Sequence, residues 1–551
     1  MADVIVLGSG AAGLTAALAA HSEGCSVLVL EKAERIGGTS AWSGGMIWIP
    51  NNHHMREAGI PDSDEEAVGY LLSMSHGLMD ETLVRAFVET GPEMVRWLEQ
   101  NTPVQFQSVG AFPDYHPEHP GGKPSGGRSL ECPMFSYKEL GAWAERVSVG
   151  EFYPEVITTM GETPLGQPIP AAIPATELER RRANQERGCG QALIGRLLKA
   201  CLDRGIEIRT GARARELCIE GGAVVGVRID SANGASDLSA SAGVVLATGG
   251  FEWNDSLVAA FLRGPMTGRV SPSTNTGDGL VMAMKAGAAL SNMREAWWLP
   301  VAQVPREGKS PLTILITSER TFPGSIMVNR EGKRFTNEAA NYNAFGAAFH
   351  EMDVSRFDYR NLPCWLIFDQ AYYDRFGFGW NAAPGNPPPK WISSAPSLAL
   401  LAKEIGVPDD ALQASVVRWN AQVAAGRDTD FARGESANDT WWGAPTKKGT
   451  REATLGPLSQ PPFYAVEIES GCLGTKGGPR VDRHARVLGH DGAPIRGLYA
   501  AGNVMGSPMG MTYGGAGGTI APGMVFGFLA GRDAAARKKA QAGSAKSARP
   551  A

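Results

Sequence analysis

Asp3-Val-Ile-Val-Leu-Gly-Ser-Gly-Ala-Ala-Gly13 is the stretch that decides the fold of this chain. Its first five residues are mostly apolar, which is typical of a buried parallel strand, and a helical pattern over 11–22 follows the first two glycines. Gly24 ends that helix, and a second apolar run, 26–30, leads to Glu31, which lies 18 residues beyond Gly13. A strand, a glycine-rich turn, a helix and a second strand ending in an acid predict a dinucleotide-binding β-α-β unit.

The glycines and the acidic residue of this unit have distinct expected roles. Gly8 permits the tight turn, Gly10 lets the backbone approach a pyrophosphate, and Gly13 lets the helix pack closely on the strand. The helix start at 11–12 presents free N–H groups and the positive end of the helix dipole to phosphate. Glu31 is expected to accept hydrogen bonds from a ribose 2′-hydroxyl.

The rest of the chain divides into three parts. Further elements are predicted at 191–203 (helix), 207–209 (strand), around Gly221-Gly222 (hairpin), 243–248 (apolar strand), 324–335 (strand, turn, strand) and 409–425 (helix). The middle is richer in Trp, Pro and Asn and has no second glycine-rich β-α turn, whereas eleven glycines return between 497 and 531. We predict an α/β, Rossmann-like domain formed by both chain ends, 1–301 and 469–551, with an inserted α+β catalytic cap at 302–468. A basic tail from about 532 is expected to be mobile.

Composition excludes several classes of protein. The 551 residues carry 52 Lys plus Arg against 57 Asp plus Glu, a formal net charge of −5, so a basic nucleic-acid surface is not expected. With 43% hydrophobic and 20% charged residues the chain is an ordinary globular protein rather than a disordered one. The 69 glycines are not periodic, which excludes collagen and implies close backbone approach to a ligand.

Location and metal content are also predicted from residue patterns. The seven cysteines contain no CxxC pair, which argues against disulfides, structural zinc, an iron–sulfur cluster or c-type haem and favours a reducing cytoplasm. The chain begins in a strand without a signal peptide, and no apolar run is long enough to span a bilayer. A peripheral contact of the basic tail with an anionic membrane stays open. No metal site is expected, because the nine histidines, His53-His54 included, show no ligand spacing.

The nature of the dinucleotide follows from three later segments. Glu31 to Ser40, Ala247-Thr-Gly-Gly-Phe251 and Gly497-Leu-Tyr-Ala-Ala-Gly-Asn503 resemble, in order, the extended motifs of FAD-binding flavoproteins. No second site for NAD(P)H and no redox CxxxxC is visible, and 37–45 contains no His for covalent attachment, so non-covalent FAD is predicted. The predicted FAD-binding residues are Gly8, Gly10, Ala11, Ala12, Gly13, Glu31, Lys32, Gly38, Thr39, Ser40, Ser43, Gly44, Gly45, Ala214, Thr248, Gly249, Gly502, Asn503, Gly518, Thr519 and Ile520.

Nearly the whole chain resembles the fumarate-reductase/succinate-dehydrogenase flavoprotein superfamily and, within it, the 3-ketosteroid Δ1-dehydrogenases. The segments that carry the resemblance are Gly-Gly-Thr-Ser-Ala-Trp-Ser-Gly-Gly (37–45), Pro-Asp-Tyr (113–115) with Pro-Gly-Gly (120–122), Gly-Ser-Ile-Met-Val-Asn (324–329), Phe-Thr-Asn-Glu (335–338) and Met-Thr-Tyr-Gly-Gly-Ala-Gly (511–517). The family usually has Pro where this chain has Gly514, which could loosen the loop without removing a hydroxyl.

The resemblance implies an activity and four catalytic positions. Tyr342 is implied as the base that removes a proton from C2 of a 3-ketosteroid, with Tyr115 hydrogen-bonded to it and easing its ionisation. Tyr513 and the Gly517 N–H are implied to hold the C3 carbonyl oxygen, where enolate charge develops. The hydride from C1 goes to flavin N5 and the electrons to an external acceptor, a quinone or another redox carrier, in steroid degradation.

Rival functions remain at this point. Dicarboxylate-reducing relatives carry an arginine where this chain has Tyr342, and a permanent cation suits a carboxylate better than a neutral ketone. This argues against a soluble fumarate reductase. A sibling that desaturates another ring bond, a 3-ketosteroid Δ4-(5α)-dehydrogenase, stays an alternative, as does a non-enzymatic flavin-binding protein.

Overall fold

The computed structural model describes residues 1–551 apart from 152–154, 233, 380–381 and 548–551. Its larger sheet has a parallel centre, in the spatial order β8 (Glu207–Arg209), β2 (Val27–Leu30), β1 (Ala2–Leu7), β11 (Gly234–Leu246) and β24 (Pro494–Ala500). Strands from both ends of the chain therefore lie side by side in one sheet. β10 (Ala223–Ser231) pairs antiparallel with β11 on one side and with β9 (Arg213–Glu220) on the other. The turn between β9 and β10 is the hairpin predicted around Gly221-Gly222.

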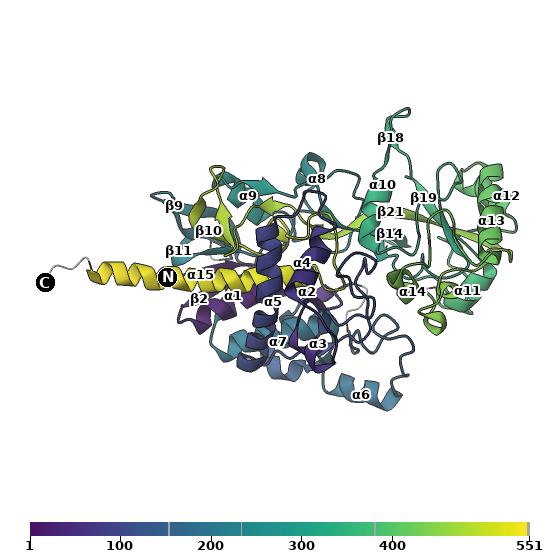
Figure 1. The fold of residues 1–551 in the computed structure, drawn as a ribbon. Helices are drawn as coiled ribbons and strands as arrows, with labels where there is room; N and C mark the ends of the chain where they lie inside the picture. Colours follow the sequence, from purple (N-terminus) through teal and green to yellow (C-terminus); the bar gives the residue numbers. More distant parts are fainter. Residues whose placement is uncertain (152–154, 233, 380–381, 548–551) are drawn as a thin grey trace.

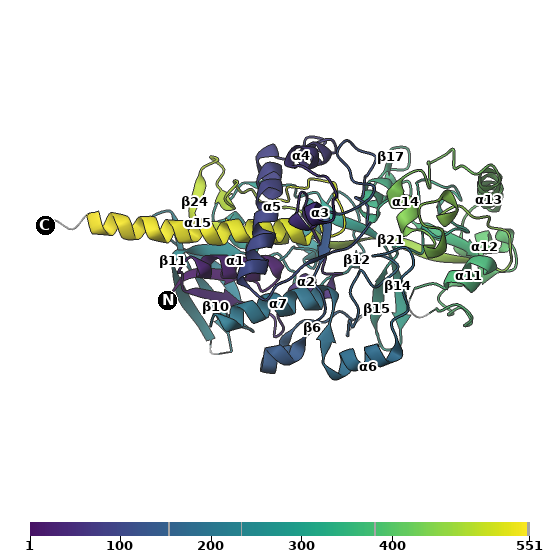
Figure 2. The same cartoon turned by 60° about the horizontal axis from the view of Figure 1, so that its bottom comes forward.

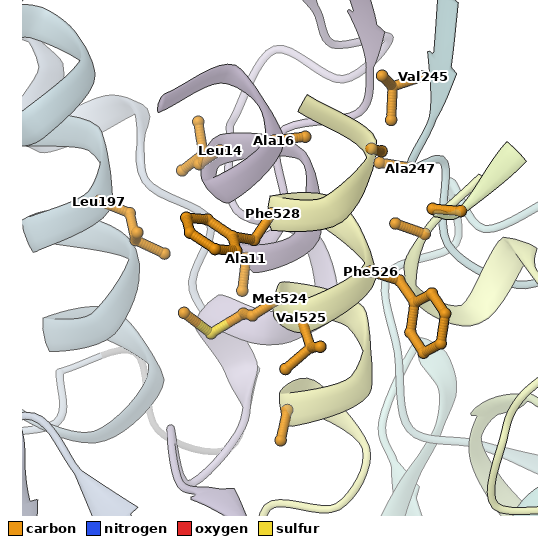
Figure 3. Close-up of a cluster of buried hydrophobic side chains, with 14 of the residues drawn as sticks. Ala11, Leu14, Ala16, Leu197, Val245, Ala247, Met524, Val525, Phe526 and Phe528 are labelled. Atoms are coloured by element: carbon orange, nitrogen blue, oxygen red, sulfur yellow. The ribbon is translucent and has the colours of Figure 1, made fainter. Parts of the chain in front are cut away.

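Two helices pack against each other beneath this sheet. α1 (Ala11–Ser22) connects β1 to β2, and α15 (Ile520–Ser547) lies alongside it (Figures 1 and 2). The approach is close because a Cβ atom on Gly527 would lie 2.3 Å from the Ala12 carbonyl oxygen, and one on Gly531 would lie 2.4 Å from that of Ala16. In Figure 3, Phe528 of α15 projects toward Leu14 of α1 and Leu197 of α7 (Cys189–Asp203), all within the main hydrophobic core.

Part of the basic tail that was predicted to be mobile is helical. It continues α15 as far as Ser547, and Lys538 pairs with Asp3 of β1 at 2.8 Å. Lys539 pairs with Glu23 at 2.7 Å. The helix persists because its first turns are buried against α1 and its later cations find acidic partners on the β1–α1 unit.

A second, mostly antiparallel sheet lies largely within the predicted cap, 302–468. Its main strands, in spatial order, are β15 (Lys309–Leu315), β14 (Ala296–Arg306), β21 (Phe463–Thr475), β19 (Cys364–Asp369) and β16 (Ser325–Asn329), with β12 (Gly268–Arg269) and β20 (Ser393–Ala395) also paired to β21. In Figure 1 it lies at the opposite end of the molecule from the C-terminal part of α15, and α12 (Leu398–Ile405) and α13 (Asp409–Ala424) lie at its outer end. The predicted boundaries at 302 and 468 fall inside β14 and β21, so these two strands run from one part of the molecule into the other. The division into domains stays a prediction.

The other helices are α2 (Gly38–Trp42), α3 (His53–Glu57), α4 (Asp64–Leu72), α5 (Glu81–Asn101), α6 (Ala175–Ala183), α8 (Asp255–Phe261), α9 (Asp278–Lys285), α10 (Phe345–Phe349), α11 (Gln370–Phe376) and α14 (Ala437–Trp442). The other strands are β3 (Ile47–Trp48), β4 (Gln107–Ser108), β5 (Ser129–Glu131), β6 (Phe135–Ser136), β7 (Glu186–Arg187), β13 (Leu290–Ser291), β17 (Met352–Asp353), β18 (Asp358–Tyr359), β22 (Gly478–Pro479) and β23 (Arg486–Leu488). Among the described residues, no helix combines the length and the apolar composition needed to cross a bilayer.

Candidate active site

Three tyrosines from distant parts of the chain meet between the two sheets. Tyr115 lies in the loop after β4, Tyr342 begins a short 3-10 turn (Tyr342–Ala344), and Tyr513 lies in the loop before α15. The hydroxyl of Tyr115 donates to that of Tyr342 at 3.1 Å. The ring centroids of Tyr513 lie 4.9 Å from Tyr115 and 5.6 Å from Tyr342, and all three side chains are buried.

The two neighbours of Tyr342 in the sequence connect it to the other two tyrosine loops. Asn341 Nδ2 donates to His116 Nε2 at 2.9 Å, which holds the loop that carries Tyr115. Asn343 Nδ2 donates to the carbonyl oxygen of Met511 at 2.8 Å, in the loop that carries Tyr513. The cap and the nucleotide-binding part are therefore joined on both sides of the predicted base.

Gly514 completes this arrangement. Its carbonyl oxygen accepts from the Tyr115 N–H at 3.0 Å and from the Tyr70 hydroxyl at 2.7 Å. A Cβ atom at this position would lie 3.0 Å from the Trp48 ring. The loop is thus held by hydrogen bonds and packing, although it lacks the proline usual in the family it resembles.

Buried charges anchor the loops, and motif reasoning gave these residues no role. Asp114 accepts from Trp48 Nε1 at 2.7 Å and from Arg128 at 2.8 Å, which fixes the residue before Tyr115. Glu338, four residues before Tyr342, is bound by Arg334 at 2.7 Å and by Arg433 at 3.2 Å. Asp114 and Glu338 stood in motif segments, whereas the burial of their arginine partners became visible only in the structure.

The predicted carbonyl-oxygen pair is also brought together. The Tyr513 hydroxyl accepts from Thr519 Oγ1 at 2.8 Å, and the backbone N–H groups of Gly517 and Thr519 point at the same oxygen. Gly517 has φ +102°, and a Cβ atom there would lie 2.6 Å from the Ile47 backbone, so only glycine fits. The Tyr513 hydroxyl and the Gly517 N–H therefore lie next to each other, as two donors to one ketone oxygen would need to.

Burial dominates the ionisation of the three tyrosines. It raises the pKa of Tyr115 and Tyr342 well above the usual value for a phenol. The pKa of Tyr513 is raised by burial too, against the lowering effect of the Thr519 hydroxyl. The contacts with the Tyr115 and Tyr513 hydroxyls raise the pKa of Tyr342 further. Each hydroxyl can both donate and accept a hydrogen bond.

Aromatic side chains surround the tyrosines. Trp297 packs edge-on against Tyr513 at 4.8 Å between ring centroids, and Trp442 lies 6.1 Å from Tyr342. Phe112 lies 6.4 Å from Tyr115 and 5.7 Å from Trp441. Of the tryptophan pairs noted in the sequence, Trp297, Trp441 and Trp442 thus line the site, whereas Trp298 packs in a separate core cluster.

The glycine-rich turn forms a second feature beside this site. A Cβ atom on Gly8 would lie 2.2 Å from the Ala247 carbonyl oxygen, and one on Gly13 would lie 2.0 Å from that of Gly8. Gly10, by contrast, has more space, since a Cβ atom there would lie 3.6 Å from Ser40 Oγ and 3.8 Å from the Gly37 carbonyl oxygen. The turn therefore packs tightly on the strand side and leaves the start of α1 open to a ligand.

Comparison with known proteins agrees with this geometry. The family model described as "FAD binding domain" matches residues 3–520. The chain belongs to this family of FAD-binding flavoproteins. It is 42% identical over 96% of its length to 4-oxocyclohexanecarboxylate 2-dehydrogenase of Sinomonas cyclohexanicum (92% of that protein), and 39% identical over 96% to 3-oxosteroid 1-dehydrogenase of Mycobacterium tuberculosis (97% of that protein).

A solved structure gives the same result. The 3-ketosteroid delta1-dehydrogenase of Sterolibacterium denitrificans, in complex with 1,4-androstadiene-3,17-dione, superposes with a TM-score of 0.87 at 35% identity over 97% of this chain and 99% of that one. The predicted α/β fold, the FAD cofactor, the oxidoreductase class and the resemblance to the 3-ketosteroid dehydrogenase family are thereby confirmed.

The residues present fit FAD. Thr248, two residues after the end of β11, has a buried hydroxyl with no partner among the described residues, as a ligand-binding group would. Gly502 has φ +77°, and a Cβ atom there would lie 3.2 Å from Ala12 Cβ, so its loop packs closely on the start of α1. A cavity beside the tyrosines is lined by Trp297, Gly502, Asn503, Met505, Ser507, Pro508, Thr519, Pro522 and Gly523.

The remaining predicted FAD residues lie at the following places in the fold. Gly38, Thr39 and Ser40 begin α2, Ser43, Gly44 and Gly45 follow it, Ala214 lies in β9, Gly249 follows Thr248, Asn503 follows Gly502, and Gly518, Thr519 and Ile520 lead into α15. Two charged members have protein partners. Glu31 accepts from Ser9 Oγ at 2.7 Å, and Lys32 pairs with Asp278 at 3.1 Å.

Motif reasoning missed two residues, Asn275 and Glu252, that hydrogen bonds connect to the predicted FAD-binding residue Thr39. Asn275 Nδ2 donates to Thr39 Oγ1 at 3.0 Å and to the buried carboxylate of Glu252 at 2.7 Å. Glu252 directly follows the segment 247–251 that resembles a flavoprotein motif, which is the one signal that could have identified it.

Four histidines lie in two groups, each with a glutamate, which their spacing in the sequence did not indicate. His53 and His54 both bind the Glu99 carboxylate, at 2.9 and 3.0 Å. His116 and His119 lie near Glu118 in a second group whose ligand atoms are within 4.8 Å of one another. In both groups the histidine rings already have protein partners. His119 Nδ1, for example, lies 3.0 Å from Ser73 Oγ.

Proposed function

We propose that this flavoprotein desaturates the C1–C2 bond of a 3-ketosteroid and passes the electrons to an external acceptor, a quinone or another redox carrier. The observation that carries the proposal is the meeting of the Tyr115–Tyr342 hydroxyl pair, 3.1 Å apart, with Tyr513 and Gly517. A base beside one carbon and two donors at the ketone oxygen are what removal of an α-proton requires.

Tyr342 is the proposed base for the C2 proton. A buried phenol is a weak base near neutral pH, since burial raises its pKa. Tyr115 offsets this by donating to the oxygen on which the negative charge forms. The proton leaves C2 as the ketone becomes an enolate, so base and oxyanion donors act in the same step.

Tyr513 and the Gly517 N–H are the proposed donors to the ketone oxygen. Their positions are fixed before substrate arrives, by Thr519 and by the close packing of Gly517 on Ile47. Such preorganised donors contribute about 10²–10³-fold each in comparable sites. Bound FAD supplies the hydride acceptor for C1.

The residues proposed to hold FAD are those of the glycine turn, the 38–45 segment, Ala214, Thr248–Gly249, Gly502–Asn503 and the start of α15. The N-termini of α1 and α15 offer N–H groups to anionic parts of the cofactor. Attachment is proposed to be non-covalent, and the location cytoplasmic, with any membrane contact peripheral.

The surroundings favour an apolar substrate. In the part of the chain that the structure describes, no lysine or arginine forms a cation–π contact or an ion pair with Tyr115, Tyr342 or Tyr513; the ring neighbours of these tyrosines are aromatic. A neutral steroid ring suits such walls better than a carboxylate does.

A second candidate rests on one observation. The 42% identity to a 4-oxocyclohexanecarboxylate 2-dehydrogenase favours a small cyclic ketone acid as the substrate. The bond desaturated there is also next to a ring ketone, so the same four residues would serve.

An anaerobic titration of the yellow protein distinguishes these functions. We expect androst-4-ene-3,17-dione or cholest-4-en-3-one to bleach the flavin and yield the 1,4-diene, identified by mass and NMR. Bleaching only by 4-oxocyclohexanecarboxylate would favour the second candidate. A 4-ene product from a 5α-saturated ketone would identify a Δ4-(5α)-dehydrogenase, and oxidation of reduced viologen by fumarate a fumarate-reductase-like enzyme.

A further inference from the structure

Lys476 is a fully buried lysine beside the tyrosine site. Its Nζ donates to the carbonyl oxygen of Thr512, the residue before Tyr513, at 2.7 Å. The same ammonium lies 4.1 Å from the centroid of the Trp297 ring, whose edge packs on Tyr513. One indole ring therefore separates a buried cation from the proposed carbonyl-oxygen donor.

This lysine lacks an acidic partner. Among the described residues no carboxylate lies within 4.0 Å of its Nζ, and the nearby Glu295 pairs instead with Arg263 at 3.3 Å. Burial accordingly lowers the pKa of Lys476 to about 7, against the raising effect of Glu295. A cation held in this way costs stability, so packing alone does not explain it.

Hydrogen bonds and close packing fix the backbone on both sides of Lys476. The Lys476 N–H donates to the Glu295 carbonyl at 2.9 Å, and its own carbonyl accepts from Ser507 at 2.9 Å. A Cβ atom on the following residue, Gly477, would lie 2.4 Å from Met293 Cα. The chain is clamped on both sides of the lysine.

We propose that Lys476 is a positioning residue of the tyrosine site, which fixes the Thr512 carbonyl and Trp297 against Tyr513 and whose ammonium favours the negative charge that forms on Tyr342 and on the ketone oxygen. The inference rests on the proposed desaturation, because only that chemistry builds negative charge there. A cation separated from the reacting atoms by an aromatic ring acts through the field and not by touching the substrate.

The test is Lys476→Met, which keeps the length and removes the charge. We expect the variant to bind FAD with an unchanged visible spectrum. We expect ketone-driven flavin reduction to be about tenfold slower than in wild type at pH 6, where the Lys476 ammonium is charged, and this difference to fade above pH 8, where wild-type Lys476 is largely neutral. Wild-type behaviour of this pH profile would overturn the electrostatic role.

Thermal unfolding of the same variant provides a readout independent of turnover. The folded pKa of Lys476 lies below that of an unfolded lysine, so its cost is full below pH 7 and fades as pH rises toward about 10.4. Lys476→Met should therefore unfold at a higher temperature than wild type, with the larger gain at pH 6 and the smaller at pH 9. A lower unfolding temperature at both values would show that the lysine is a structural residue and overturn the proposal.

Lys448→Met is the matched control. Lys448 Nζ also lies over an indole ring, 4.0 Å from the Trp441 centroid, and donates to the Pro164 carbonyl. Trp441 contacts Phe112 and has no ring contact with Tyr513 within the described residues. Its loss should leave the pH profile where wild type has it; equal shifts in both variants would overturn the assignment to Lys476. If no ring ketone reduces the wild-type flavin, the proposed function fails, and the unfolding comparison still decides whether Lys476 is retained at a cost.

Discussion

Tyr115→Phe removes one hydroxyl and, with it, the hydrogen bond to Tyr342. That bond is 3.1 Å long and buried, and the Tyr115 ring packs between Tyr342 and Tyr513. Since Phe keeps the ring, the variant isolates the effect of the donor. It tests whether Tyr115 assists ionisation of the base or only fills space.

The expected size follows from the difference between two states. A hydrogen bond to a charged acceptor is worth about 1.5–3 kcal/mol and one to a neutral acceptor about 0.5–1.5. Their difference, about 1–1.5 kcal/mol, corresponds to about one unit in the pKa of Tyr342. Burial already raises that pKa, so the base is mostly protonated over the working range and the rate should rise with pH. In Tyr115→Phe this rise should begin about one pH unit higher, with reduction about tenfold slower at pH 8.

The assay is stopped-flow reduction of bound FAD by a 3-ketosteroid between pH 6 and 10. Tyr372→Phe is the control, because its buried hydroxyl also makes one hydrogen bond, to the Glu319 carbonyl at 2.7 Å, in a separate core cluster of the cap. Both variants should lose about 1 kcal/mol of stability. If Tyr115→Phe retains the wild-type pH profile, or shifts no more than the control, the proposed role of Tyr115 is refuted.

Three further changes test the rest of the site and the fold that holds it. Tyr513→Phe should keep bound yellow flavin and lose orders of magnitude in kcat; wild-type turnover would refute the oxyanion role. Tyr342→Phe should abolish exchange of the C2 proton with solvent, measured by NMR in deuterated buffer, and continued exchange would exclude it as the base. Gly531→Val should push α15 away from α1, because even a Cβ atom would lie 2.4 Å from the Ala16 carbonyl oxygen, and should cost about 1–3 kcal/mol in urea unfolding; an unchanged midpoint would contradict the close packing.

Local patterns predicted local structure well. The helix expected at 11–22 has those bounds, and the strand at 207–209 and the hairpin around Gly221-Gly222 lie where the sequence places them. These elements depend on neighbours in the chain: apolar spacing, a glycine at the turn, a charge at the end. The helical continuation of the C-terminal tail had no local signal, because its lysine contact depends on Asp3, more than 500 residues earlier, whose position no local pattern contains.

Residues that act through burial were missed for a related reason. Lys476 and Arg128 look like ordinary surface cations in the sequence, and only the fold reveals that both are buried completely. The family motifs identified the tyrosines, since a motif records positions that touch ligand. The two asparagines that flank Tyr342 were visible in the same segment, but their partners, His116 and Met511, become neighbours only when the cap closes on the nucleotide-binding part.

The buried tyrosine base presents a physical conflict that the surrounding residues resolve together. An apolar pocket is needed to bind a steroid ring and exclude water, yet the same burial disfavours a phenolate on Tyr342. The Tyr342 phenolate carries the negative charge before it takes the C2 proton, and the enolate carries it afterwards. The donors at Tyr115 and Tyr513, with the cation at Lys476 behind Trp297, are proposed to favour the charge at both places. The low dielectric of the pocket strengthens each of these interactions, so burial makes the neutral site stable and the charged transition state accessible.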